Sequence, residues 1–414
     1  MKRTYFIGLS LAPAFRALGE FADEQLAPSL LPPSASLPAP GLVGVVEGFE
    51  RHGSRSPARF KQAAQELRRK GALCSFWPCV EADAFAHIGC KVLSAPSELF
   101  QKLDNKFSQI QVLEDAGDDT LKRHFAGRCD VFEPEVVPNT PARLLEAIGR
   151  RGACVATSLF SVGGYGVHLL TSATGPNFVK NWPSGPFVRL ETYRPMISAT
   201  QLAVCFTNAV VPFEPQIQYV VEYEGRLRYA GATSWSPRLS KSACSEMNSL
   251  MHSVGAALQG LGYRGAFGCD FVIDPVDHRV FFMELNARFV GETHFLSLCA
   301  AHSCLAGRTI ADRIMLDPIF LHVWSHQFAD PPEVAMDLAS PAARGAVGFD
   351  LARDGPAYTT LLLVRNLPTL FGAKGDATDA GPSMLLLDAD PAETLVAPVR
   401  FPSPYAEATG LSRF

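Results

Sequence analysis

The chain has 414 residues, of which 47% are hydrophobic and 19% are charged, and its formal net charge is −4 with a pI near 6.2. This composition is globular and excludes an intrinsically disordered chain. The basic residues form only short clusters, at 68–70 and 150–151, so we expect no nucleic acid partner, because phosphate-backbone binding needs a broad positive surface. No apolar stretch approaches the length of a membrane span, so we expect no membrane association.

The first 95 residues alternate strand-like and helix-like segments. Apolar runs predict strands at 5–10, 42–48 and 91–94, and a charged stretch predicts a helix at 58–70. This alternation favours a small α/β lobe with a largely parallel sheet.

The N-terminus and the cysteines predict a cytoplasmic protein. The opening residues resemble a secretory signal only briefly, because Pro13 and Arg16 interrupt the apolar run and no small-residue cleavage site follows. The 10 cysteines are scattered and include no Cys-x-x-Cys pair, which favours reduced thiols over a disulfide framework or a zinc site. We therefore expect the chain to begin with a β-strand in a reducing compartment.

The middle of the chain contains the longest periodic segments. Apolar residues at helical spacing predict one helix over 97–116 and another over 247–261. Strand-like segments flank a glycine-rich turn within 152–193, and 216–236 alternates around a Glu-Gly turn, as in a hairpin. Four further strands are expected, two directly after the second helix and two in the C-terminal part, which shows no chemical motif: 266–273, 279–286, 359–364 and 384–387.

Acidic and amide side chains lie in the two strands that follow the second helix. Asp270 is on the first strand, and Glu284 and Asn286 are on the returning strand. Pairing about a centre near residue 277 sets Asp270 opposite Glu284, and residues two apart share one face of a strand. Asp274 and Asp277 fall in the turn, where they are expected to face water.

This arrangement favours a divalent metal site. Two carboxylates among Phe, Val, Ile and Met side chains would repel each other and lose solvation, and a hard cation offsets both effects. Asp270, Glu284 and Asn286 are therefore the candidate metal ligands. Arg288, two positions further on, is a candidate for neutralising a developing anion beside the metal. The alternative is an exposed hairpin whose acids merely face water.

The residues Asp-Phe-Val at 270–272 and Met-Glu-Leu-Asn-Ala-Arg at 283–288 resemble the metal-binding core of the ATP-grasp family. This resemblance implies an α/β fold with three parts. They are an N-terminal Rossmann-like lobe, an ATP-grasp nucleotide and metal domain with a lid at about 150–192, and a small C-terminal α+β lobe, with expected ranges 1–95, 96–325 and 326–414.

Two further segments support the resemblance. Asp-Asn-Lys at 104–106 is similar to the family's Asp-Lys element, which implies that Lys106 contacts ATP phosphates as a catalytic cation; the alternative is a solvent-facing lysine on an amphipathic helix. Residues 161–167 look like the family's flexible phosphate loop, in which glycines let backbone N–H groups approach anionic oxygens. Its candidate ATP-binding residues are Ser161, Gly163, Gly164 and Gly166.

The strand before this loop departs from the family pattern. Most members place a second phosphate-binding lysine there, and aligning on the glycines puts Thr157 at that position, where it offers a hydrogen bond but no charge. Further along, residues 188–193 resemble the strand that meets the adenine, which implies that Glu191 accepts from the base or ribose. The alternative for Glu191 is an exposed acid on a plain strand.

The resemblance implies an ATP-dependent carboxylate–amine ligase that forms an acyl phosphate, with ATP and Mg²⁺ (or Mn²⁺) as cofactors. The Arg-x-x-Gly-x-x-His continuation resembles amino-acid ligases, so Arg288 and His294 are the candidate substrate-binding residues. The alternatives are an ATP-grasp kinase and a catalytically silent ATP-binding regulatory protein. The expected partners are a small carboxylate and an amine, and strand edges could pair two subunits as a homodimer.

Overall fold

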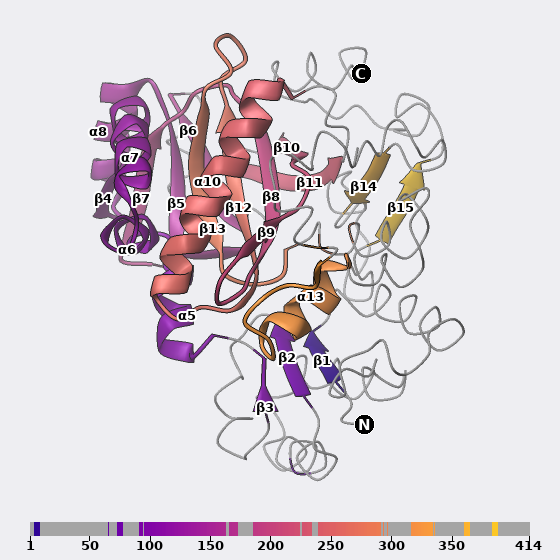
Figure 1. The fold of residues 1–414 in the computed structure, drawn as a ribbon. Helices are drawn as coiled ribbons and strands as arrows, with labels where there is room; N and C mark the ends of the chain where they lie inside the picture. The colour runs from indigo at the N-terminus through magenta and orange to yellow at the C-terminus, as the bar shows by residue number, and fades with distance from the viewer. Residues whose placement is uncertain are drawn as a thin grey trace.

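The computed structural model contains three sheets with helices packed on the largest of them (Figure 1). The residues that the structure describes are 4–8, 65, 73–77, 91–93, 95–162, 165–172, 185–223, 226–233, 239–290, 293, 296, 316–333, 335, 360–364 and 383–387.

The N-terminal sheet is parallel, as the sequence predicts. It contains β1 (Thr4–Gly8), β2 (Leu73–Trp77) and β3 (Lys91–Val92), in that spatial order. The sequence did not predict β2, a short apolar run without alternation. The strand expected at 42–48 and, apart from helical residue 65, the helix expected at 58–70 lie outside the described residues.

The helix expected over 97–116 is two helices, which corrects that prediction. They are α5 (Ser97–Asp104) and α6 (Gln109–Ala116). At the break, Asn105 adopts an extended backbone with ψ of 104°, and its Oδ1 accepts from the backbone N–H of Phe107. This local side-chain bond competes with helix formation. The backbone N–H of Lys106 is thereby free to donate to the carbonyl of Leu159, 3.1 Å away.

The central sheet has ten strands, and every pairing recorded in it is antiparallel. Its spatial order is β13-β12-β8-β10-β11-β6-β5-β7-β4, with β9 paired to β8. The bounds are β4 (Glu135–Pro138), β5 (Ala153–Val162), β6 (Tyr165–Thr171), β7 (Phe187–Thr192), β8 (Ile197–Cys205), β9 (Val210–Pro212), β10 (Gln216–Tyr223), β11 (Arg226–Thr233), β12 (Gly265–Ile273) and β13 (Val280–Asn286). The two predicted hairpins, β10–β11 and β12–β13, are both present.

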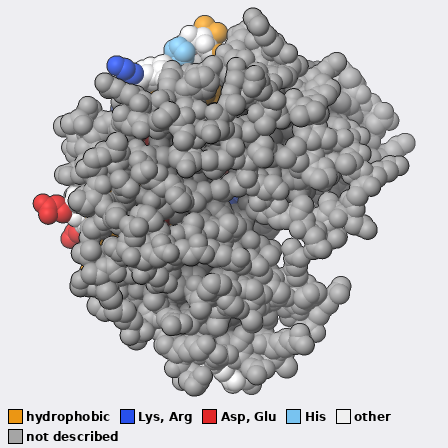
Figure 2. Space-filling model, turned by 90° about the vertical axis from the view of Figure 1, so that its right-hand side faces the viewer, with side chains coloured by type: hydrophobic (Ala, Val, Ile, Leu, Met, Phe, Trp, Pro, Cys, Tyr) orange, Lys and Arg blue, Asp and Glu red, His pale blue; other side chains and the backbone are white. Residues whose placement is uncertain are grey.

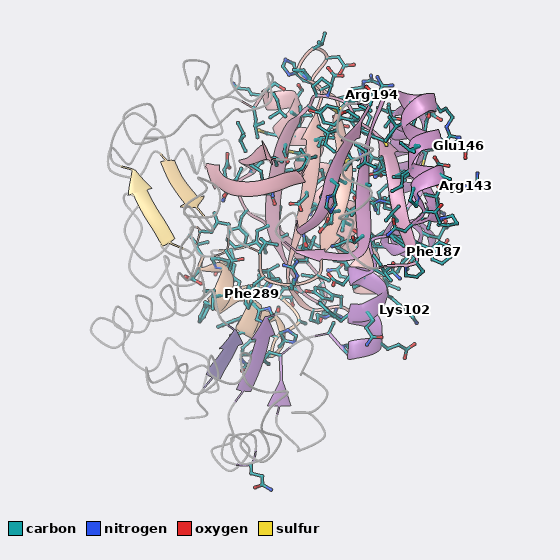
Figure 3. The ribbon with its side chains drawn as sticks, turned by 180° about the vertical axis from the view of Figure 1, so that it is seen from behind. Lys102, Arg143, Glu146, Phe187, Arg194 and Phe289 are labelled. Atoms are coloured by element: carbon teal, nitrogen blue, oxygen red, sulfur yellow. The ribbon has the colours of Figure 1, made fainter. Side chains whose placement is uncertain are left out.

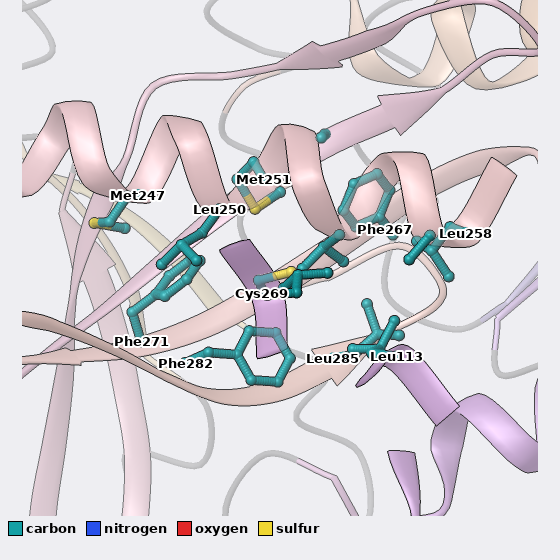
Figure 4. Packing of buried hydrophobic residues seen from close by; sticks show 14 of the residues in the cluster. Leu113, Met247, Leu250, Met251, Leu258, Phe267, Cys269, Phe271, Phe282 and Leu285 are labelled. Carbon is teal, nitrogen blue, oxygen red and sulfur yellow. The ribbon is translucent and has the colours of Figure 1, made fainter. Parts of the chain in front are cut away.

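The main core lies between the β8, β12 and β13 strands and the helix α10 (Lys241–Gly260), which runs along them (Figures 1 and 4). Helix α10 begins after Ser240, whose hydroxyl accepts from the N–H of Ala243, as an N-cap does. Its apolar face, which includes Met247, Met251 and Leu258, packs on Phe267 and other strand residues. This burial fixes the hairpin that carries the candidate metal ligands.

A second, smaller core lies under the β5 and β7 strands. Helix α8 (Pro141–Arg151) buries Leu144, Ala147 and Ile148 against one face of these strands, which contributes Cys154, Ala156, Val188 and Leu190. The other face, which carries Val155, Thr157, Arg189 and Glu191, therefore points away from α8. It is turned toward helix α7 (Asp119–Phe132), whose Arg128 reaches both Glu191 and β13.

The C-terminal part of the chain contributes α13 (Pro318–Ser325), which packs against β12 and β8, and the antiparallel pair β14 (Thr360–Val364) and β15 (Ser383–Leu387). Both strands match the predicted runs. Among the described helices, none combines the length and the apolar character needed to cross a membrane. On the face drawn in Figure 2, the described side chains that reach the surface are few and scattered.

Candidate functional site

The β12–β13 hairpin brings the three expected oxygen ligands together. Asp270 is the register partner of Glu284, and Gly268 is the register partner of Asn286, so the predicted pairing is confirmed. The Nδ2 of Asn286 donates to Oδ2 of Asp270 at 3.1 Å. From β10, which β8 separates from β12 in the sheet, Nε2 of Gln218 donates to Oδ1 of Asp270 at 3.0 Å. Two carboxylates and one amide thus lie at one place on the sheet.

Lys106 is buried against this hairpin. Its side chain has an exposed fraction of 0%, and its Nζ lies 2.5 Å from Oε1 of Glu284 and 3.7 Å from Oδ1 of Asp104. It also donates to the carbonyl of Leu285 at 3.4 Å. The alternative of a solvent-facing lysine is therefore wrong: the ammonium points at a candidate metal ligand.

Arg288 completes the cluster on the far side of Asn286. The Nη2 of Arg288 donates to Oδ1 of Asn286 at 2.9 Å, and its Nη1 donates to the carbonyl of Phe289 at 3.2 Å. Phe289 itself packs against His322 of α13, with ring centroids 4.5 Å apart, in the interior of the molecule (Figure 3). Arg288 is thus held rigidly within reach of the hairpin.

Asp104 is a site residue to which the sequence assigned no role. Burial raises the pKa of its carboxyl above the ordinary value, Lys106 and Arg288 oppose that rise, and Glu284 adds to it. Its Oδ1 has no hydrogen-bond partner within the described part of the chain. Asp104 therefore belongs to the same charged cluster as Lys106, Glu284 and Arg288.

The residues present fit a divalent cation. The described residues include no group of three or more His, Cys, Asp and Glu side chains that could hold a metal. The candidate set instead combines the carboxylates of Asp270 and Glu284 with the amide oxygen of Asn286. Magnesium typically binds to few carboxylates together with substrate phosphates, so this oxygen donor set suits it. The buried Oδ1 of Asp104 is a further oxygen beside the cluster.

The β5–β7 strands hold the other candidate residues. Thr157 is buried on β5, and its register partner on β7 is Arg189. Gly166 is on β6 with φ of 90°, a conformation that favours glycine. Gly163, Gly164, the side chain of Ser161 and the whole of His294 lie outside the described residues, so their roles stay predictions.

Glu191 is buried rather than exposed, which excludes the alternative of a solvent-facing acid. Its Oε1 accepts from Nη2 of Arg128, and its Oε2 lies 3.4 Å from Nη2 of Arg189. Burial alone would raise the pKa of Glu191, but the Arg189 and Arg128 guanidiniums outweigh it and lower that pKa. The carboxylate is thus ionised and bound to two arginines. Its expected contact with adenine or ribose stays a prediction.

Solved structures with this arrangement of strands and helices are known. The structure is similar to biotin carboxylase from Campylobacter jejuni in its β-γ-ATP complex, with a TM-score of 0.53, 13% identity, and 81% of this chain and 73% of that chain covered. For N5-carboxyaminoimidazole ribonucleotide synthetase from Thermus thermophilus, the TM-score is 0.49 and the identity is 14%, with 78% of each chain covered. For carboxyaminoimidazole ribonucleotide synthase from Aspergillus clavatus, complexed with ATP, the TM-score is 0.47 and the identity is 13%, with 71% of this chain and 72% of that chain covered. The chain has the ATP-grasp fold.

The ATP-grasp fold is evident from structure and not from overall sequence similarity. No protein-family model matches the sequence, and no curated protein matches it either. The α/β fold class and the resemblance to ATP-grasp proteins, which the sequence predicts from short motifs, are confirmed at the level of the fold.

Besides Asp104, three residues of the candidate site were missed by the sequence reasoning. Arg189 lies two residues before Glu191, and that spacing, which puts both on one face of a strand, was the available signal. For Gln218, the signal was its place in the alternating pattern of β10, in which every second residue lies on the same face of the strand. Arg128 gave no signal, because its partners Glu191 and Phe282 are 63 and 154 residues away in the sequence.

Proposed function

We propose that this ATP-grasp protein is an ATP-dependent carboxylate–amine ligase that forms an amide or peptide bond through an acyl phosphate. The observation that carries the proposal is the cluster of Asp270, Glu284 and Asn286 with the buried ammonium of Lys106, 2.5 Å from Glu284. A lysine beside two carboxylates suits a phosphorylated substrate with its metal ion. The ammonium would pair with phosphate oxygens, and the carboxylates would pair with the metal.

Asp270, Glu284 and Asn286 are the residues that would hold Mg²⁺, with Mn²⁺ as an alternative. When bound, the metal would neutralise charge on phosphate oxygens. The protein's own contribution is positioning. Gln218 orients Asp270, and Arg288 orients Asn286, each through one hydrogen bond.

Lys106 and Arg288 would do the remaining electrostatic work. A carboxylate oxygen is a weak nucleophile, so its attack on the γ-phosphorus requires alignment and compensation of the charge that builds up there. Lys106 supplies a compact cation for phosphate oxygens, and Arg288 supplies a planar one for the acyl phosphate or the tetrahedral species that follows. The glycine-rich segment at 163–166 would then cover the phosphates and exclude water, which would otherwise hydrolyse the acyl phosphate.

The amine acceptor is proposed because the continuation after Arg288 resembles amino-acid ligases, with Gly291 and His294 in the matching positions. The substrates are thus expected to be small acids and amines, such as amino acids, in a cytoplasmic setting. The similar structure of biotin carboxylase is a complex with β-γ-ATP, which supports ATP as the nucleotide. No membrane or nucleic acid partner is proposed.

The test is to measure phosphate and ADP release from ATP and Mg²⁺ across a panel of amino acids and small carboxylic acids, singly and in pairs. A ligase releases phosphate only when both an acid and an amine are present, and mass spectrometry then finds the condensed product. ADP without free phosphate would instead identify a kinase. Tight ATP binding without turnover in any mixture would identify a regulatory nucleotide-binding protein and reject the ligase.

A further inference from the structure

Arg128, Glu191 and Arg189 form a buried cluster with more positive than negative charge. The side chains of the two arginines have exposed fractions of 0% and 8%, and that of the glutamate has 3%. Each arginine contacts the same carboxylate. A nearby third arginine, Arg151, adds positive potential at Glu191, although its own ion pair is with Glu135.

Two N–H donors of this cluster have no acceptor among the residues that the structure describes. The Nη1 of Arg128 and the Nε of Arg189 are buried and lack a hydrogen-bond partner within the described part of the chain. A buried donor without an acceptor costs free energy, and so does a buried charge without a counter-charge. Both costs are removed if an anion binds at this place. Arg128 is fixed to β13 by its bond to the carbonyl of Phe282 at 2.7 Å.

Arg189 lies at the position where the sequence lacks a cation. It is directly opposite Thr157 in the antiparallel pairing of β5 and β7, and directly opposite residues project from the same face of a sheet. That face points away from the α8 core. The Nη1 of Arg189 also donates to the backbone carbonyl of Lys106, the other cation of the proposed nucleotide site. The charge absent at Thr157 is thus supplied one strand away.

We propose that Arg189 binds the phosphates of the nucleoside triphosphate, as the second cation of the site in place of a lysine at position 157. This inference rests on the proposed function, because it requires that the chain binds ATP. Arg128 is a positioning residue here: it shares the charge of Glu191, so that this carboxylate does not fully neutralise Arg189. The guanidinium keeps its Nε–H for an oxygen of the ligand, and such charge-assisted bonds to phosphate are strong.

The experiment is isothermal titration of the full chain with a non-hydrolysable ATP analogue and Mg²⁺, and separately with adenosine. Arg189→Gln should weaken binding of the analogue roughly 10- to 100-fold, the loss of one charge-assisted bond, and leave adenosine binding within about twofold. The double variant Arg189→Gln/Thr157→Lys should recover most of that loss, because it returns the cation to the same face. Arg143→Gln, on the exposed side of α8, is the matched control and should bind both ligands as the wild type does (Figure 3).

Thermal unfolding of each variant separates binding from folding. If Arg189→Gln does not fold, Arg189→Lys is tested instead. It keeps the positive charge but loses the planar set of guanidinium N–H donors. Analogue binding should then fall several-fold while adenosine binding stays constant. Equal weakening of both ligands, unchanged analogue binding, or absence of recovery in the folded double variant would overturn the inference. A wild-type chain that binds no analogue would reject the proposed function itself. Sensitivity to Lys106→Ala without sensitivity to Arg189→Gln would reject only this inference.

Discussion

The β12–β13 hairpin and the β5–β7 strands hold their charges in different ways. In the hairpin, Asp270 and Glu284 are brought together by one short turn, and the charges that balance them come from Lys106 and Arg288. In β5–β7, the charges come from a strand and a distant helix, and the cations outnumber the carboxylate. Local pairing therefore brings the candidate metal ligands together, whereas the proposed anion site is assembled by tertiary contacts alone. Four variants can break or sharpen this comparison.

The largest effect is expected for Glu284→Gln in the hairpin. The change removes one charge from the candidate metal ligands at nearly constant volume. We expect this to cost several kcal/mol of transition-state stabilisation and to lower the rate about a thousand-fold. The ammonium of Lys106 keeps the carbonyl of Leu285 and Asp104 as partners, so the fold should persist. ATP turnover and circular dichroism are the measurements. Full activity in a folded variant would reject Glu284 as a metal ligand.

The next largest effect is expected for Arg128→Met in the other region. This change keeps the volume but removes the ion pair to Glu191 and the bond to the carbonyl of Phe282. Removing one partner of a buried ion pair leaves the other charge uncompensated, which should lower the free energy of unfolding by about 3–5 kcal/mol. Denaturant unfolding measures this loss, with Arg143→Met, on the exposed side of α8, as the control. A loss no larger than that of the control would show that the pair is not important for stability.

A smaller, pH-dependent effect is expected for His124, which links α7 to β13. Its Nε2 accepts from the N–H of Phe282 at 2.9 Å, and burial, with help from Arg128, lowers its pKa from 6.5 to about 4. The unfolded chain therefore takes up a proton at higher pH than the folded chain does. Stability is complete above pH 6.5 and falls as the pH drops toward 4, by on the order of 3 kcal/mol.

His124→Gln keeps an acceptor for Phe282 but cannot take up the proton. The difference in unfolding free energy between the wild type and this variant should shift in favour of the variant as the pH falls from 6.5 to 4. Buried His322, whose pKa burial also lowers to about 4, is common to both proteins and cancels in the difference. A difference that does not change with pH would mean that folding does not lower the pKa of His124.

The smallest effect is expected for Asp277→Asn at the tip of the hairpin. Asp277 is exposed and pairs with Arg279 of the same turn, at 2.6 Å. Exposed pairs of this kind contribute little, so activity should stay within about twofold of the wild type. This variant is the matched control for Glu284→Gln, because both remove one carboxylate from the same hairpin. A large loss of activity would mean that hairpin charge in general, and not the metal ligand, sets the rate.

The hairpins could be predicted from the sequence because their contacts are local. Alternation and one turn fixed the partners of β12 and β13, including Asp270 opposite Glu284, and the same held for β10 and β11. The ATP-grasp fold itself followed from a few motif residues. Lys106 was singled out from the order of the motifs, but its burial beside Glu284 was not evident from the pattern of one amphipathic helix.

The rest could not be predicted because it depends on distant partners. The break between α5 and α6 arises from a competing bond at Asn105 and from a carbonyl on β5. The Arg128–Glu191 pair joins a helix to a strand 63 residues away. Sequence periodicity gives the face on which a residue lies, but not which distant element meets that face. Thr157 therefore looked like a simple loss of charge, when its neighbour across the strands is Arg189.

The break at Lys106 makes this one residue a mechanical link between the two regions. Its backbone N–H is bonded to Leu159 of β5, and its carbonyl accepts from Arg189 of β7, while its side chain is bonded to Glu284 of β13. The β5–β7 strands cannot move away from the hairpin without breaking either the backbone bonds or the ion pair. Opening of this segment and release of the ammonium from Glu284 are thus thermodynamically coupled, so that a ligand which competes for Glu284 also changes the cost of opening.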